Sequence, residues 1–110
     1  MTNYIEFEVG DETYKLRLGM NAIVQLEKKL GCNPMGIFGS GSTIPTITQM
    51  CDILHASLQK YHHGCNLDKA RDIFEDYLCE NSQTDFIPVI LEIYKVSGII
   101  PKDAEEAEKN

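Results

Sequence analysis

The feature that most constrains the fold is a change of hydrophobic period near residue 19. Residues 4–18, YIEFEVGDETYKLRL, alternate between apolar and polar side chains, which is typical of strands with one buried face. The segment GDE interrupts the alternation, so the two halves are predicted to form a β-hairpin in which Glu6 and Glu8 face Lys15 and Arg17. Because a lone hairpin is only marginally stable in water, the rest of the chain must cover its apolar face.

After residue 19 the apolar residues recur with helical spacing instead. Helices are predicted at about 20–30, 46–63, 67–80 and 85–97. Gly31 is expected to cap the first helix at its C-terminus, and Asn66 and Asp85 are expected to cap the third and fourth at their N-termini. Residues 31–45 contain several Gly and Pro residues and keep no hydrophobic period, so they are predicted to form a loop.

These elements predict an α+β fold, with an N-terminal β-hairpin packed on a bundle of about four α-helices. The chain has 110 residues, which fits one domain, predicted to span residues 1–100. Residues 101–110, PKDAEEAEKN, are polar and mostly charged. They are predicted to form an acidic flexible tail.

The charge balance argues against nucleic acid as a partner. The net charge is -7, and the 10 Lys and Arg residues are scattered, whereas phosphate-backbone binding needs clustered basic side chains. No apolar run approaches the length of a membrane span, and the first residues do not resemble a secretory signal. A cytosolic location is therefore expected, with the four cysteines as reduced thiols.

The segment GIFGSGST, residues 36–43, has the glycine spacing of a phosphate-binding loop. Such a loop must follow a strand and lead directly into a helix, so that backbone amides converge on the phosphates. Here the glycines follow a predicted helix, Ser42 stands at the lysine position, and Pro45 interrupts the entry to the next helix. The segment is interpreted as a mobile helix–helix connection.

No set of residues predicts an enzyme, a cofactor site or a metal site. Cys51 and His55 are one turn apart on a predicted helix, but His62 lies about two turns further on, so one ion could not easily be held by both histidines. The cysteines show no local signature of a nucleophile with an assigned base. Catalytic, cofactor-binding and metal-binding residues are therefore all predicted to be absent.

Two helix surfaces are candidates for contact with another protein. The third predicted helix carries acidic residues along one side, which are interpreted as a solvated face or as a docking surface for a basic partner. Its acidic residues are Asp68, Asp72, Glu75, Asp76 and Glu80. The apolar residues of the fourth helix cover an arc of about 220°, which is wider than an ordinary surface helix needs. That helix is either central to the bundle or shares its apolar surface with a partner.

On the second alternative, the edges of the fourth helix and the two isoleucines after it form the main apolar contact. The predicted partner-binding residues are Leu91, Val96, Ile99 and Ile100. Phe86, Ile90 and Ile93 lie nearer the middle of the arc and are predicted to be core.

The order of these patterns resembles that of the small tail assembly chaperones of long-tailed bacteriophages. In that family a hairpin ending in Y-x-L-R leads to a helix with LE near its middle, then to a Gly-rich loop and further helices. The matching residues are Tyr14, Leu16, Arg17, Leu26 and Glu27, followed by the helix from Ile47 to Leu58. The resemblance covers about residues 4–98; the cysteines and the YHHG segment lie outside its pattern.

The resemblance implies a non-enzymatic role in the host cytoplasm. Such chaperones bind the tape measure protein, keep it soluble, assist assembly of the tail tube around it, and are not retained in the mature virion. Many also exist as a frameshifted longer form, which would be a second partner here, and self-association is left open. The alternative is a structural head–tail connector or tail-completion subunit, which would persist in the virion.

Overall fold

The computed structural model describes residues 3–39 and 44–103. Within these ranges the chain forms a two-stranded antiparallel hairpin followed by four α-helices and one short 3-10 helix. The elements are β1 (Ile5–Val9), β2 (Glu12–Leu16), α1 (Met20–Leu30), η1 (Pro34–Phe38), α2 (Ile47–Leu58), α3 (Leu67–Tyr77) and α4 (Phe86–Val96). The predicted α+β fold, a hairpin packed on a helical bundle, is confirmed.

The strand register of the hairpin agrees with the expected charge pairing only in part. Glu6 pairs with Lys15 across the two strands, as expected. The expectation that Glu8 also faces Lys15 or Arg17 is wrong: Glu8 faces Thr13, and Arg17 lies beyond the end of β2. Arg17 Nη1 instead donates hydrogen bonds to the carbonyl oxygens of Asn3 and Val96, at 2.9 and 2.8 Å. The guanidinium thereby joins the hairpin exit to the C-terminal end of α4.

The segment after α1 contains structure that its composition did not predict. Gly31 ends α1 in the left-handed conformation, with a φ of 74°, as the cap prediction requires. Residues 34–38 then form η1 instead of an irregular loop; the Asn33 side chain accepts a 2.9 Å hydrogen bond from the Met35 N–H, and Ile37 is buried. The interpretation of residues 40–43 as a mobile connection lies outside the described residues.

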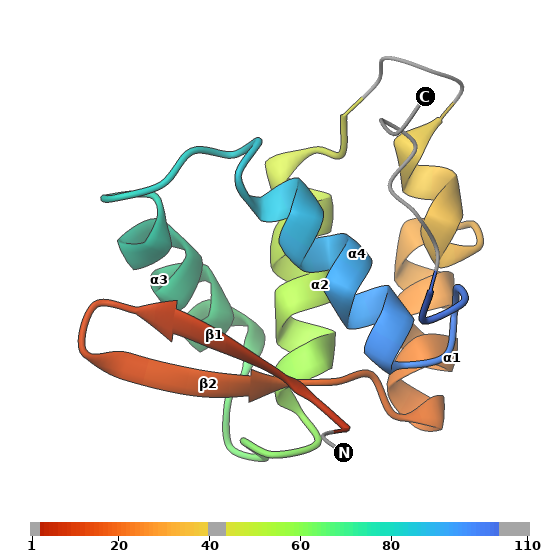
Figure 1. Ribbon diagram of the computed structural model, residues 1–110, viewed down its shortest axis with the longest axis horizontal. Coiled ribbons are helices and arrows are strands. Elements are labelled where there is room, and N and C mark those ends of the chain that lie inside the picture. The colour runs from red at the N-terminus through yellow and green to blue at the C-terminus, as the bar shows by residue number, and fades with distance from the viewer. Residues whose placement is uncertain (1–2, 40–43, 104–110) are drawn as a thin grey trace.

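Helix α2 is the central helix of the domain. It contacts α1, α3, α4 and β2, and in Figure 1 it runs behind α4, with α1 on one side and the hairpin and α3 on the other. Thr46 caps it with a complete capping box to Gln49. The widest apolar arc belongs to α4, but the most enclosed helix is α2.

The prediction that α2 continues to residue 63 is wrong. The helix ends at Leu58, and the following residues turn toward α3. The Gln59 side chain stabilises this turn, because its Nε2 donates to the carbonyl oxygens of His55 and Cys65 at 2.9 and 2.6 Å. Tyr61 therefore lies outside the helix and is exposed.

The last two helices are slightly shorter than predicted, at 67–77 and 86–96. Asn66 caps α3 as expected, since its side chain accepts a 2.8 Å hydrogen bond from the Lys69 N–H. Asp85 does not cap α4 with its side chain. Its carboxylate accepts instead from the Ser82 N–H at 2.8 Å and stabilises the turn before the helix.

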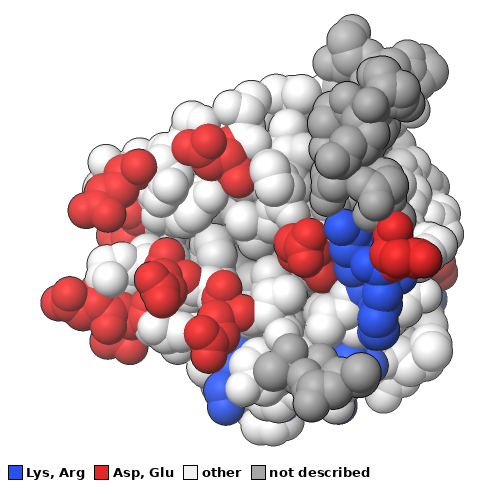
Figure 2. Space-filling view, viewed as in Figure 1, with Lys and Arg blue, Asp and Glu red and all other residues white. Residues whose placement is uncertain are grey.

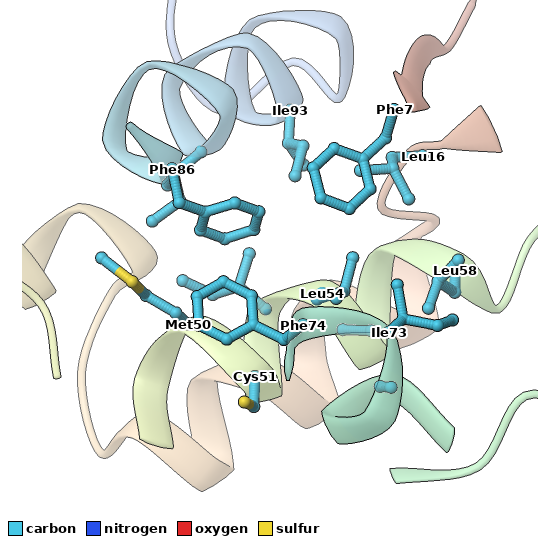
Figure 3. Packing of buried hydrophobic residues seen from close by; sticks show 14 of the residues in the cluster. Phe7, Leu16, Met50, Cys51, Leu54, Leu58, Ile73, Phe74, Phe86 and Ile93 are labelled. Carbon is cyan, nitrogen blue, oxygen red and sulfur yellow. The ribbon is translucent and has the colours of Figure 1, made fainter. Parts of the chain in front are cut away.

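The core lies where α4, α2, α3 and the hairpin meet. Figure 3 shows Phe7 and Leu16 of the hairpin directed toward the same interior as Phe74 of α3 and Phe86 of α4. The Phe74 and Phe86 rings pack edge to face with their centroids 5.0 Å apart. Over the described ranges, no helix combines the length and apolar character that crossing a membrane requires.

Candidate partner-binding surface

The four residues predicted to bind a partner are all half-buried. Leu91 and Val96 lie on α4 with intermediate exposure, and Ile99 and Ile100 pack against the core after the Gly98 turn. The residues predicted to lie under them, Phe86, Ile90 and Ile93, are fully buried, so the expected difference between edge and middle of the helix is confirmed. The role of the edge in binding stays a prediction.

Among residues 3–39 and 44–103, the most exposed large apolar side chain is on α1 instead. Met20 is 73% exposed and Val24, one turn later, is 41% exposed. Other exposed large hydrophobic residues are Met35, Ile44, Ile47 and Tyr61. Contiguous exposed apolar surface is the usual mark of a protein-binding site.

The sequence contained a signal for these two residues. Ile23, Leu26 and Leu30 define the apolar stripe of α1. Met20 and Val24 lie roughly 90–130° from the middle of that stripe at 100° per residue. The three stripe residues are enough to pack α1 against the domain. Large apolar residues outside the stripe therefore indicate a surface that is available to a partner.

Three adjoining hollows surround the exposed ridge of α1. The first lies between α1 and α2, has a volume of about 400 Å³, and is lined by the buried residues Leu26 and Ala56 among others. The second lies at Met20 and reaches Ser97 at the end of α4, and the third lies between Met20 and Lys60. The third hollow shares lining residues with each of the other two, so the three form one run, which we call the α1 groove.

The charge of the α1 groove differs from that of the rest of the protein. The described residues that line it include three basic ones, Arg17, Lys29 and Lys60. Asp52 is the one carboxylate among them. Asp52 is itself paired with Lys29, whose Nζ lies 3.3 Å from its Oδ1. The groove therefore combines an apolar floor with a positive rim, in a chain whose net charge is -7.

Carboxylates gather on a different side of the molecule. The acidic residues predicted along α3 are all exposed, and those of the hairpin are exposed as well. Figure 2 shows these carboxylates over the side of the molecule occupied by the hairpin and α3, while the larger area of Lys and Arg lies on the other side. Carboxylates also lie beside that area of Lys and Arg, so the acidic residues are concentrated at the hairpin and α3 but are not confined to them.

His55 lines the α1 groove, and its surroundings favour the neutral form of the imidazole ring. Burial lowers the pKa of His55, and the nearby Lys29 ammonium lowers it further, although Asp52 acts in the opposite direction. A neutral imidazole adds both a hydrogen-bond donor and an acceptor to the wall of the groove.

The cysteines and histidines do not assemble a reactive centre within the described ranges. Burial raises the pKa of the Cys51 and Cys65 thiols, which lowers the fraction of nucleophilic thiolate at neutral pH. His62 is occupied by a structural contact, since its Nε2 accepts a 3.0 Å hydrogen bond from the Lys15 N–H. In the part of the chain that the structure describes, no three His, Cys, Asp or Glu side chains are placed to hold a metal ion.

Comparison with protein-family models, with curated proteins and with solved structures gave no match. Any assignment of function therefore depends on the sequence patterns and on the surface described above.

Proposed function

We propose that the protein is a tail assembly chaperone of a long-tailed bacteriophage, which binds apolar segments of the tape measure protein in the host cytoplasm. The observation that carries the proposal is the exposed apolar ridge of α1, Met20 and Val24, beside an open groove in a strongly acidic chain. The resemblance of the hairpin and first helix to that family supplies the identity of the partner.

The physical properties of the surface suit a binding protein for apolar segments. Methionine is unbranched and polarisable, so Met20 can adapt to different apolar partners. A net charge of -7 keeps a complex soluble after part of its apolar surface is covered.

Coexpression with the tape measure protein of the same phage tests this function. The tape measure protein should be insoluble when expressed alone, and it should become soluble and copurify with this chain when the two are expressed together. If the tape measure protein stays insoluble and none copurifies, the proposal is wrong.

Mass spectrometry of purified virions separates the chaperone from a structural subunit. A chaperone is released before the tail is complete, so its peptides should be absent from virions but present in infected cells. Peptides of this chain in stoichiometric amounts with tail proteins would indicate the alternative, a connector or tail-completion subunit. The same infected-cell sample should contain the longer frameshifted form if one is made.

A further inference from the structure

We propose that the α1 groove binds an amphipathic helix that carries acidic side chains beside its apolar stripe. The apolar side chains would enter the hollow between α1 and α2 and cover Met20, while the acidic side chains would face Lys29 and Lys60. The inference rests on the proposed function for the source of the helix, which is taken to be the tape measure protein.

The charge distribution selects an acidic partner. Among the described residues, three basic side chains line the groove, Arg17, Lys29 and Lys60, against one acidic side chain, Asp52. Helix α1 adds to this potential, because its first turn holds no acidic residue and Gly19 provides no capping side chain. The positive end of the helix dipole is therefore not compensated by its own side chains. A partner with carboxylates at these positions gains electrostatic complementarity that a basic or neutral partner does not.

The shape of the groove selects a helix over an extended strand. Strand addition requires an exposed strand edge with unpaired backbone N–H and C=O groups. The lining residues come from α1, from α2 and its following turn, from the segment before β1, and from segments beyond the ends of β2 and α4. None of them belongs to a strand, whereas a hollow between two helices suits the apolar face of a third.

Two synthetic peptides of about 18 residues, long enough to be helical in isolation, test the chemistry of the partner. Both have leucines at i, i+3, i+4 and i+7; one has glutamates at the flanking positions and the other has glutamines. Fluorescence anisotropy at low ionic strength should show the glutamate peptide binding about fivefold more tightly than the glutamine peptide. This difference should shrink as salt is added, because the rim of the groove is exposed to solvent.

Matched variants of the intact protein locate the site. Met20→Asp should weaken binding of the glutamate peptide about tenfold, because it places a charge in the apolar contact. Ile47→Asp, at a residue that is 45% exposed but outside the groove, should change binding less than twofold. Lys60→Glu should weaken binding about threefold or more, and Lys69→Glu, an equal charge change at an exposed site on α3, should not. Circular dichroism establishes that each variant is folded, and Asp at position 20 is favourable for the first turn of a helix.

The outcomes separate this inference from the proposed function. If the glutamate peptide does not bind, binds no better than the glutamine peptide, or is unaffected by Met20→Asp, the inference is wrong. A tape measure protein that copurifies equally well with wild type and with Met20→Asp would retain the function and refute the groove. Peptide binding that depends on Met20, together with failure to solubilise the tape measure protein, would retain the groove and refute the function.

Discussion

Helices α1 and α2 have nearly equal length but opposite relations to solvent. Of the 12 residues of α2, eight are buried, including the polar residues Asp52 and Ser57. Of the 11 residues of α1, Leu26 is the buried one, and two large apolar side chains point into solvent. The two helices pack against each other and η1 also contacts α1, but these neighbours leave Met20 and Val24 open to solvent.

This difference teaches that apolar content alone does not identify the helix that meets a partner. Helix α4 is the most apolar of the four by sequence, but its apolar residues are used against α2 and the hairpin. Helix α1 has fewer apolar residues, yet Met20 is the most exposed of the large ones. What matters is how much of the apolar surface the neighbouring elements cover.

The largest expected effect is on folding stability, and it distinguishes the buried helix α2 from the more exposed helix α1. Leu54→Asp in α2 should unfold the domain, because an unpaired charge at a fully buried position costs several kcal/mol against a total stability of about 5–15 kcal/mol. Val24→Asp in α1, at a residue that is 41% exposed, should leave the melting temperature nearly unchanged. Thermal unfolding followed by circular dichroism measures both, and equal losses of stability would contradict the comparison.

A smaller effect is expected where α4 holds the segment that follows α1. The Tyr94 hydroxyl donates a buried hydrogen bond of 2.9 Å to the Pro34 carbonyl oxygen at the start of η1. Tyr94→Phe leaves that buried oxygen without its partner, which should lower the free energy of unfolding by about 1–3 kcal/mol. Urea unfolding measures this change, and a neutral substitution would show that water can replace the hydroxyl.

The same hydroxyl predicts a loss of stability at alkaline pH. Burial raises the pKa of Tyr94 above its ordinary value, which is about 10 in the unfolded chain. Its contribution to stability is therefore complete below pH 10 and is lost as the pH rises above that value, because the unfolded state ionises first. The urea midpoint should fall above pH 10, and the fall should be shallower in Tyr94→Phe. Burial also raises the pKa of Tyr14 and Tyr77, so some decline should remain in the variant.

The smallest effect on stability is expected at the ion pair that joins the two compared helices. Lys29 of α1 is about half exposed, so its contact with Asp52 of α2 is screened by solvent. Lys29→Gln should lower the free energy of unfolding by about 0.5–1 kcal/mol, and less at high salt. A loss of more than about 2 kcal/mol would mean that the carboxylate depends on Lys29 as a buried group does.

The elements of the fold were predictable where a hydrophobic period was long enough to recognise. The alternation of residues 4–18 predicted the hairpin, and of the expected charge pairing across it the structure has Glu6 opposite Lys15. The hydrophobic pattern did not predict η1, because a 3-10 helix of five residues, capped by Asn33, is too short to show a hydrophobic period. The end of α2 was missed because it depends on the Gln59 side chain contacting Cys65, a contact six residues away that composition does not reveal.

The centre of the fold and the groove could not be predicted in the same way. Asp52 and Ser57 are polar residues buried in α2; Lys29 pairs with the carboxylate, and the Ser57 hydroxyl donates to the Leu54 carbonyl oxygen at 3.0 Å. Their polar groups are therefore satisfied inside the protein. The α1 groove combines residues from α1, from α2 and from the end of α4, so it depends on tertiary packing; of the two apolar residues beyond the α1 stripe, Met20 lines the groove and Val24 does not.

Site-specific photocrosslinking to the tape measure protein tests most directly whether α1 or the edge of α4 meets the partner. A photoreactive benzoylphenylalanine would replace Met20 in one variant and Leu91 in another, with Ile47 as the control position outside both surfaces. Each variant would be coexpressed with the tape measure protein and irradiated, and the crosslinked peptides would be identified by mass spectrometry. Our account predicts strong crosslinking from position 20, little from position 91 and none above background from position 47. Strong crosslinking from position 91 with little from position 20 would contradict it and place the partner on the edge of α4 with Val96, Ile99 and Ile100.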